Sequence, residues 1–184
     1  MADDHAVVRQ GFRLILSHEP DMEIVGEAGN GREALALCGE LKPDVVVMDV
    51  AMPELNGMEA TRRLIASSPN TRVLALSMHK DGVYVREMLR AGARGYLLKD
   101  SIDRDLLAAV RAVAKGESYL SPAISDAVLN DYRPNVTNPL DLLTSREGEV
   151  LQMIAEGGTN KEIANILKLS VYTVEAHRGR IMEK

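Results

Sequence analysis

The sequence predicts a doubly wound α/β domain with a parallel sheet, followed by a small all-α domain. In the first two-thirds of the 184 residues, short runs rich in β-branched residues alternate with amphipathic segments at helical spacing. This alternation is typical of parallel βαβ units with helices on both faces of the sheet. After residue 140 only helical patterns remain, so the two parts differ in class.

Four short runs in the first part are predicted to be strands, at 22–28, 44–49, 72–77 and 95–98. The runs at 45–48 and 73–76 are entirely apolar, which is typical of strands buried on both faces. The segments around the strands carry apolar residues every three or four positions, as Leu106, Ala109 and Val113 do. They predict helices at 5–17, 31–40, 56–67, 81–91 and 102–115.

The last part of the chain is predicted to form three helices, at 145–156, 160–167 and 171–183. Thr144 with Glu147, and Thr159 with Glu162, each fit a capping box, and these pairs place two helix starts. A polar stretch rich in proline and asparagine precedes them and is typical of a linker, with room for a short helix at 123–132. We therefore expect a first domain over 1–118, a linker over 119–141 and a second domain over 142–184.

Composition is that of a folded globular protein, with 46% apolar and 27% charged residues. No apolar run is long enough to span a bilayer and no charged-then-apolar leader opens the chain, so we expect a cytoplasmic protein without a membrane partner. Cys38 has no second cysteine to pair with and is expected to pack in the core. The net charge of −5 gives no support to nucleic-acid binding, which must therefore be argued from pattern.

Three carboxylates lie where strands are expected to end. Asp3 and Asp4 precede the first predicted helix, and Asp49 closes the apolar run at 45–48. In open parallel sheets, binding sites form beyond the carboxyl ends of the strands. Converging carboxylates need a cation between them, and Mg²⁺ prefers oxygen ligands of this kind. The alternative is that Asp3 and Asp4 cap the helix and Asp49 is a solvated strand end.

Ser77 and Lys99 favour the first interpretation, because each closes another predicted strand and would lie at the same edge of the sheet. Carboxylates that hold a metal, an ammonium that neutralises phosphate oxygens and a hydroxyl that donates a hydrogen bond together suit phosphoryl transfer. One carboxylate could act as the nucleophile and form an acyl phosphate.

Residues 2–118 resemble receiver domains of NarL/FixJ-type two-component response regulators. The strings that carry the resemblance are Ala2-Asp3-Asp4-His5, Met48-Asp49-Val50-Ala51-Met52-Pro53 with Gly57, Leu76-Ser77, and Gly95-Tyr96-Leu97-Leu98-Lys99-Asp100. The resemblance implies that Asp49 is the phosphorylated residue. It also implies that Asp3, Asp4, Asp49 and the Ala51 carbonyl hold Mg²⁺.

The same resemblance assigns roles to three further residues. Ser77 is the hydroxyl that moves toward the phosphate, Lys99 neutralises it, and Tyr96 is the aromatic residue that changes rotamer on activation. Asp100 stands where receivers in general often have proline, as is usual in this subgroup. A sensor histidine kinase is the implied partner, and no enzyme activity is implied beyond Mg²⁺-dependent self-phosphorylation and self-dephosphorylation.

Residues 142–184 are similar to the LuxR-type helix-turn-helix, through Leu143-Thr144-Ser145-Arg146-Glu147, Asn160-Lys161-Glu162-Ile163-Ala164, Thr173-Val174-Glu175 and His177. At about 100° per residue, Val174, His177 and Ile181 share one face of the last helix, and Ala176 and Gly179 lie opposite. A face of small residues with charged edges suits a helix that enters the major groove.

The LuxR-type resemblance implies a transcription regulator that binds double-stranded DNA, as a homodimer when active, and contacts RNA polymerase. The implied DNA-contacting residues are Thr159, Lys161, Thr173, Glu175, Ala176, Arg178, Gly179 and Arg180. A three-helix protein-interaction module is the alternative for this part of the chain.

Both resemblances also imply elements that these 184 residues do not contain. Receivers have a central first strand before the acidic pair, and LuxR-type domains continue into a fourth helix, whereas only Met1 and Ala2 precede Asp3 and the sequence stops at Lys184. We hypothesise that Met1 is an internal methionine of a longer reading frame, and we expect a sheet without its central strand to fold poorly.

Two other functions compete with a phosphorylation-controlled regulator. A phosphatase of the haloacid dehalogenase kind would need an aspartate two residues after its nucleophile, and Ala51 stands there. A phosphate-independent DNA binder or adaptor would not require Asp49, Ser77 and Lys99 together.

Overall fold

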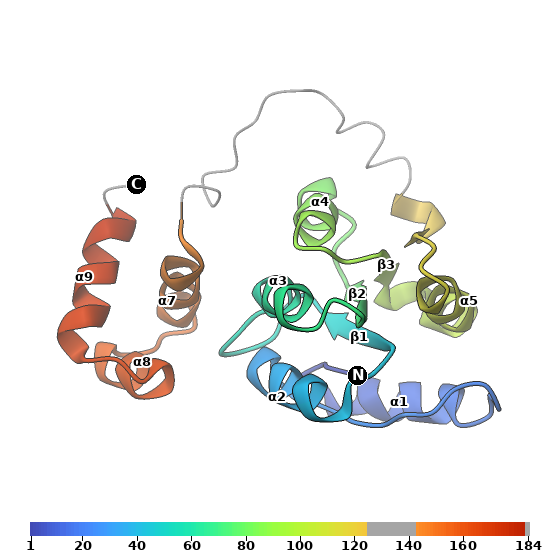
Figure 1. The fold of residues 1–184 in the computed structure, drawn as a ribbon. Helices are drawn as coiled ribbons and strands as arrows, with labels where there is room; N and C mark the ends of the chain where they lie inside the picture. Colours follow the sequence, from blue (N-terminus) through green and yellow to red (C-terminus); the bar gives the residue numbers. More distant parts are fainter. Residues whose placement is uncertain (125–142, 183–184) are drawn as a thin grey trace. The chain divides into compact units, whose positions relative to one another are not determined.

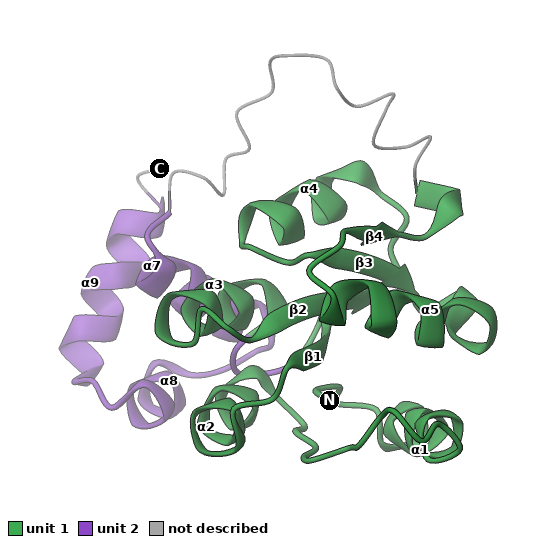
Figure 2. Ribbon diagram, turned by 45° about the vertical axis from the view of Figure 1, so that its right-hand side comes forward, with its two compact units in different colours: residues 1–52, 56–133 green, residues 53–55, 134–184 purple. Residues whose placement is uncertain are grey.

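The computed structural model describes residues 1–124 and 143–182. The chain divides into two compact units, one of residues 1–52 and 56–133 and one of 53–55 and 134–184 (Figure 2). Each unit is described by itself. In the described parts of the chain, no helix has both the length and the apolar character needed to cross a membrane.

The first unit is built on a parallel sheet in the order β1 (Val45–Asp49), β2 (Arg72–Ser77), β3 (Gly95–Leu98) and β4 (Tyr119–Leu120). The register aligns Val47 with Leu74 and Leu76 with Leu97. Three of the predicted strands are therefore confirmed, and so is the α/β class. The strand predicted at 22–28 is wrong: within this range only Ala28 makes a β-bridge, to Ala2. Ala2 makes a second bridge to Met48, so it lies between the two segments.

Helices cover both faces of the sheet. They are α1 (Ala6–Leu16), α2 (Gly31–Leu41), α3 (Gly57–Ser67), α4 (Gly82–Arg90) and α5 (Ile102–Ala114), with a short 3₁₀ turn, η1 (Lys99–Ser101), before the last. The side chains of Asn30, Asn56 and Asp81 accept the first backbone N–H groups of α2, α3 and α4 and so fix where these helices begin. α1 and α5 lie on one face, and α2, α3 and α4 on the other (Figure 1).

The core on the α1 and α5 side joins these two helices to the sheet. Phe12 from α1 and Leu106 from α5 are buried against Leu74, Leu76 and Leu97 of the strands. The apolar spacing that predicted these helices therefore matches the faces they bury.

β4 lies in the segment where the sequence predicted a linker. Tyr119 and Leu120 pair with β3, and the backbone N–H of Leu98 donates to Ser121 Oγ at 3.1 Å. Ile124 is buried. The two-residue strand is too short to show a period, which is why its pattern carried no signal. The short helix predicted at 123–132 lies mostly outside the described residues.

The second unit contains three helices, α7 (Ser145–Ala155), α8 (Asn160–Leu167) and α9 (Val171–Met182). Both predicted capping boxes are confirmed, with Thr144 and Thr159 as the capping residues. The helices pack around one core, which consists of Val150, Met153, Ile163, Ala164, Leu167 and Val174. Lys168 ends α8 in the left-handed conformation, with φ of 54°, and turns the chain toward α9.

Candidate functional site

Asp3 and Asp49 meet at the carboxyl edge of the sheet. Asp49 is the last residue of β1, and its backbone N–H donates to the Ala2 carbonyl at 2.8 Å. The same pairing places Asp3 beside the end of β1. Both residues are almost fully buried, with 1% and 2% exposed. A solvated strand end is therefore wrong for Asp49, because its carboxylate is shielded from water.

Lys99 follows β3 and lies between the two buried carboxylates. Its Nζ is 2.7 Å from Asp3 Oδ2 and 2.7 Å from Asp49 Oδ2. Burial raises the pKa of Asp49, against the effect of its hydrogen bond with Lys99, and the nearby Asp3 raises it further. Burial alone would lower the pKa of Lys99, but the hydrogen bonds to the two carboxylates outweigh it and the pKa is raised. The ammonium therefore stays charged and offsets one of the two negative charges.

Asp4 and His5 form the solvent-facing side of the cluster. His5 Nδ1 lies 2.9 Å from Asp4 Oδ1 and 3.2 Å from Asp3 Oδ1. The backbone N–H of His5 donates to Asp3 Oδ1 at 2.8 Å and orients the Asp3 carboxylate, but His5 is the N-cap residue of α1 and no side-chain capping bond is made there, so Asp3 does not act as the N-cap of this helix. The sequence assigns His5 no role beyond its place in the string Ala2-Asp3-Asp4-His5. Its place directly after two acids was the available signal for a role here.

The donor set fits a hard divalent cation. Ligand atoms of Asp3, Asp4, His5 and Asp49 lie within 4.8 Å of one another. Three carboxylates and one ammonium leave a net charge of −2 at the edge of the sheet, which a divalent ion would neutralise. The backbone N–H of Ala51 donates to Asp49 Oδ1 at 3.3 Å and brings the Ala51 backbone next to this cluster.

Gly57 permits the tight turn beyond Asp49. A Cβ atom at this position would lie 1.8 Å from the Asp49 carbonyl oxygen, which no side chain can tolerate. The Gly57 N–H donates to the Val50 carbonyl at 3.0 Å and closes the turn. The glycine eight residues after the central aspartate therefore has a steric cause.

Ser77 and Tyr96 are both buried and are connected through His79. The His79 backbone N–H donates to Ser77 Oγ at 3.0 Å, and the Tyr96 hydroxyl donates to the His79 carbonyl at 3.0 Å. Burial raises the pKa of Tyr96, so its hydroxyl remains a donor. The His79 ring stacks on Tyr84 with centroids 4.5 Å apart. His79 makes both of these hydrogen bonds with its backbone, so its residue type does not indicate a role in the sequence.

In the second unit, α9 packs one face inward and leaves another exposed. Val174 is fully buried, and Ile181 packs against the same core. Glu175, Gly179 and Arg180 are exposed. Among the described residues, nothing lies within 4 Å of a Cβ atom placed at Gly179, so packing against them does not require glycine there.

Several of the residues expected to contact DNA already have partners within the unit. Arg178 Nη1 donates to Asn160 Oδ1 at 3.0 Å, and the Asn160 amide donates to Glu175 at 3.4 Å. The hydroxyl groups of Ser170 and Thr173 are hydrogen-bonded at the start of α9, with 2.8 Å between their oxygens. In the capping box, Thr159 Oγ1 donates to the Glu162 carboxylate and accepts from the Glu162 backbone N–H.

For the remaining residues expected at the DNA interface, the structure gives their position and exposure. Lys161 is exposed in the first turn of α8, and Ala176 is half-buried on α9. Sequence spacing predicted the face that each residue occupies, but not the Asn160 bridge between α8 and α9.

Comparison with protein families assigns both parts of the chain. The family described as "Response regulator receiver domain" matches residues 1–111, and the family described as "Bacterial regulatory proteins, luxR family" matches residues 141–184. Both resemblances drawn from the motifs are confirmed.

Individual relatives agree with this. The chain is 45% identical over 192 residues to the oxygen regulatory protein NreC of Staphylococcus aureus, covering 100% of this chain and 88% of that protein. A LuxR-family two-component response regulator from Aurantimonas sp. SI85-9A1 is 35% identical, with a TM-score of 0.68 over 71% of this chain and 93% of that one. The response regulator RcsB in complex with DNA is 25% identical, with a TM-score of 0.65 over 98% and 87% of the two chains.

Proposed function

The chain belongs to the two-component response regulators that join a receiver domain to a LuxR-type DNA-binding domain, and we propose that Asp49 is its phosphoacceptor. It is a phosphorylation-controlled regulator of transcription. One observation supports Asp49 above all: its buried carboxylate shares the Lys99 ammonium with Asp3, 2.7 Å from each. We place the receiver at residues 1–118, extended by β4 to Leu120, and the DNA-binding domain at 142–184.

This geometry supports phosphoryl transfer to Asp49. A carboxylate oxygen of Asp49 bonds to phosphorus while the bond from phosphorus to the donor breaks, and the donor leaves with the bonding electrons. A phosphohistidine of a sensor kinase is the donor we propose. Lys99 already lies against Asp49 and can neutralise a phosphate oxygen. In self-dephosphorylation, a water oxygen would bond to phosphorus while the bond from phosphorus to the Asp49 oxygen breaks, releasing inorganic phosphate and restoring the Asp49 carboxylate.

Mg²⁺ is the cofactor we propose for this site. Asp3, Asp4, Asp49 and the Ala51 carbonyl would hold it, and the ion would supply positive charge against the phosphoryl oxygens. The residues of this chain then position the carboxylate: Asp3 is fixed by the His5 N–H, and Asp49 by the Ala51 N–H.

The switch would run through Ser77 and Tyr96. A phosphate on Asp49 offers strong acceptor oxygens, and the Ser77 hydroxyl is the donor we propose to move toward them. That movement would break the contact between Ser77 Oγ and the His79 N–H and free the segment that also binds the Tyr96 hydroxyl. The surface around α4 and β3 would then rearrange.

The exposed face of α9 is the proposed reader of the major groove. Glu175, Ala176 and Gly179 would face base edges, whereas Lys161 and Arg180 would contact phosphates. Thr159, Thr173 and Arg178 would reach the backbone of the DNA from positions that also stabilise α8 and α9. We propose a homodimer as the active form and RNA polymerase as a further partner.

A labelling experiment tests the proposal. The chain is incubated with acetyl phosphate and Mg²⁺ and resolved on a phosphate-affinity gel. We expect a shifted band that is lost in Asp49→Asn and on addition of EDTA. A shifted band that persists in Asp49→Asn would place the phosphoryl group elsewhere.

A further inference from the structure

Arg9 of α1 connects this helix to the backbone of Asp3. Its Nη1 donates to the Asp3 carbonyl at 2.5 Å. Asp3 precedes the first turn of α1, so its carbonyl lies outside the hydrogen-bond ladder of the helix. Among the described residues, no backbone N–H donates to this carbonyl, and the guanidinium group takes that place. The contact is needed because a buried carbonyl without a donor is costly.

Glu27 fixes the guanidinium group that holds Asp3. Arg9 Nε lies 3.3 Å from Glu27 Oε2, and the side chains of Arg9 and Glu27 are 22% and 24% exposed. Because the guanidinium group is planar, binding Glu27 through Nε sets the direction of Nη1 toward the Asp3 carbonyl. Lysine carries a single ammonium on a flexible stem and has no such fork.

Arg13 binds the same carboxylate as Arg9 but does not contact Asp3 in the described part of the chain. Its Nε donates to Glu27 Oε1 at 3.0 Å, and its side chain is 61% exposed. The two arginines therefore place the same charge at the same glutamate, and of the two only Arg9 reaches the acidic cluster. Arg13 is the matched control for the charge of Arg9.

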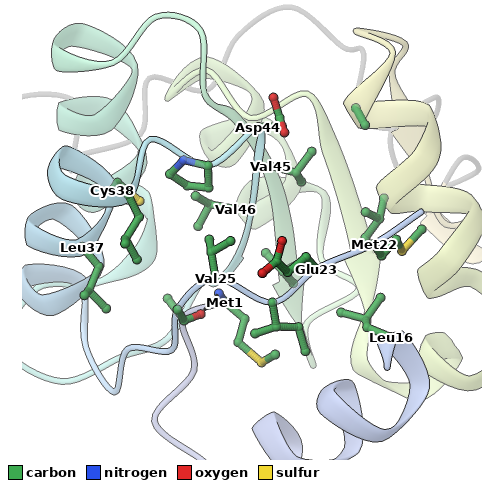
Figure 3. A pocket seen from close by; sticks show the side chains of 18 of the residues that line it. Met1, Leu16, Met22, Glu23, Val25, Leu37, Cys38, Asp44, Val45 and Val46 are labelled. Atoms are coloured by element: carbon green, nitrogen blue, oxygen red, sulfur yellow. Dashed lines mark hydrogen bonds between the residues drawn. The ribbon is translucent and has the colours of Figure 1, made fainter. Parts of the chain in front are cut away.

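The segment that carries Glu27 borders a cavity of about 720 Å³. Figure 3 shows Glu23 and Val25 of this segment around the cavity together with Val45 and Val46 of β1. Glu27 is not among the lining residues, although both of its neighbours in sequence are. Its carboxylate is instead held by α1, so these ion pairs tie the segment to the helix.

The contact with Arg9 completes the set of hydrogen bonds around Asp3. The Asp3 N–H donates to the Ala28 carbonyl at 3.1 Å. On the side chain, Oδ1 accepts from the His5 N–H at 2.8 Å, and Oδ2 lies 2.7 Å from Lys99 Nζ. With its carbonyl held as well, the backbone on both sides of the Asp3 Cα is fixed, and this fixes the orientation of the carboxylate.

We propose that Arg9 is a positioning residue for the divalent-cation site: it holds the Asp3 carboxylate in the orientation that binds the ion, and Glu27 holds Arg9. The inference rests on the proposed function, because it takes the ion at Asp3 and Asp49 as given. Arg9 touches neither the ion nor the phosphate in this proposal and acts through the backbone of Asp3. Replacing residues that orient metal ligands typically weakens metal affinity about tenfold or more.

Charge and position predict opposite effects of removing Arg9. By charge alone, the loss of a cation close to a cation site would strengthen Mg²⁺ binding. Loss of position would weaken Mg²⁺ binding, because the Asp3 carboxylate would no longer be held in one orientation. The sign of the change in Mg²⁺ affinity therefore distinguishes the two effects.

Calorimetric titration of magnesium chloride into the full chain and its variants measures this sign. We expect Arg9→Met to raise the Kd for Mg²⁺ about tenfold or more. Arg9→Lys keeps the charge but lacks the planar fork, and it should raise the Kd by a smaller factor. Arg13→Met should leave the Kd unchanged or lower it. A Kd in Arg9→Met no higher than that of the wild type would overturn the proposal.

Circular dichroism in EDTA establishes that each variant is folded before the titration. If Arg9→Met does not fold, Arg9→Lys decides the test, and a Kd equal to that of the wild type would then overturn the proposal. A wild-type chain that binds no Mg²⁺ would contradict the proposed metal site and, with it, this inference. Equal binding by the wild type and the Arg9 variant would contradict only the role of Arg9.

Labelling by acetyl phosphate at increasing Mg²⁺ separates positioning from a direct role in phosphoryl transfer. We expect Arg9→Met to need about tenfold more Mg²⁺ for half-maximal labelling and to reach the wild-type rate at saturating Mg²⁺. A labelling rate that stays low at saturating Mg²⁺ would contradict a role limited to holding the metal ligand.

Discussion

Replacing Lys99 by methionine removes the one ammonium that lies between the buried carboxylates of Asp3 and Asp49. Each carboxylate oxygen is 2.7 Å from Nζ, and the side chains of Lys99, Asp3 and Asp49 are 9%, 1% and 4% exposed. At an effective dielectric constant of about 20, one such pair is worth about 6 kcal/mol before desolvation. Folding of the wild type removes the ammonium from water, and this desolvation cost offsets part of the attraction. We therefore expect Lys99→Met to lower the free energy of unfolding by about 3–5 kcal/mol.

Urea unfolding followed by circular dichroism, with EDTA present, measures this loss. Lys80→Met is the matched control, because Lys80 pairs with Asp100 at 3.4 Å with both side chains more than half exposed. That exposed pair should contribute no more than about 1 kcal/mol. Saturating Mg²⁺ should recover part of the loss in Lys99→Met, since the ion supplies charge to the same oxygens. A loss below about 1 kcal/mol in Lys99→Met would refute the reasoning that these carboxylates depend on the ammonium.

Three further predictions concern stability and DNA binding. Thr159→Ala removes the cap of α8 and should lower the free energy of unfolding by about 1 kcal/mol in urea titrations, whereas Thr159→Ser should be nearly neutral. The Arg13 and Arg9 guanidinium groups hold the pKa of Glu27 below its ordinary value of 4.5. Glu27→Gln should therefore cost up to about 1 kcal/mol at pH 7 and progressively less as the pH falls below 4.5, and a constant difference across pH would contradict this. Gly179→Ala should stabilise α9 by about 1 kcal/mol but weaken binding to operator DNA, which fluorescence anisotropy measures. Unchanged affinity would contradict the placement of α9 in the major groove.

The strand ends of the sheet could be predicted from the sequence because an apolar run identifies a buried strand and its last residue lies at a known edge. Asp49, Ser77 and Lys99 were placed together by this argument, and all three are at that edge. The two capping boxes were predictable for a similar reason, since their residues interact at a fixed local spacing.

What the sequence did not predict depends on contacts between distant segments. The 22–28 run has β-branched residues, but a strand forms only where a neighbour pairs with it, and Ala2 reaches only Ala28. The bridge between α8 and α9 is made by Asn160, which belongs to a motif string but had no role assigned to it, because its partners Glu175 and Arg178 lie 15 and 18 residues away. His79 acts through its backbone, which leaves no signal in residue type.

The most direct test of the account compares DNA affinity with and without the phosphoryl donor. Operator fragments selected from genomic DNA are titrated with wild-type chain and with Asp49→Asn, each with Mg²⁺ and with or without acetyl phosphate. We expect the donor to tighten DNA binding by the wild type and to leave the affinity of Asp49→Asn unchanged. An equal response of both proteins, or no response of either while Asp49 is labelled, would contradict control of the DNA-binding domain by this carboxylate.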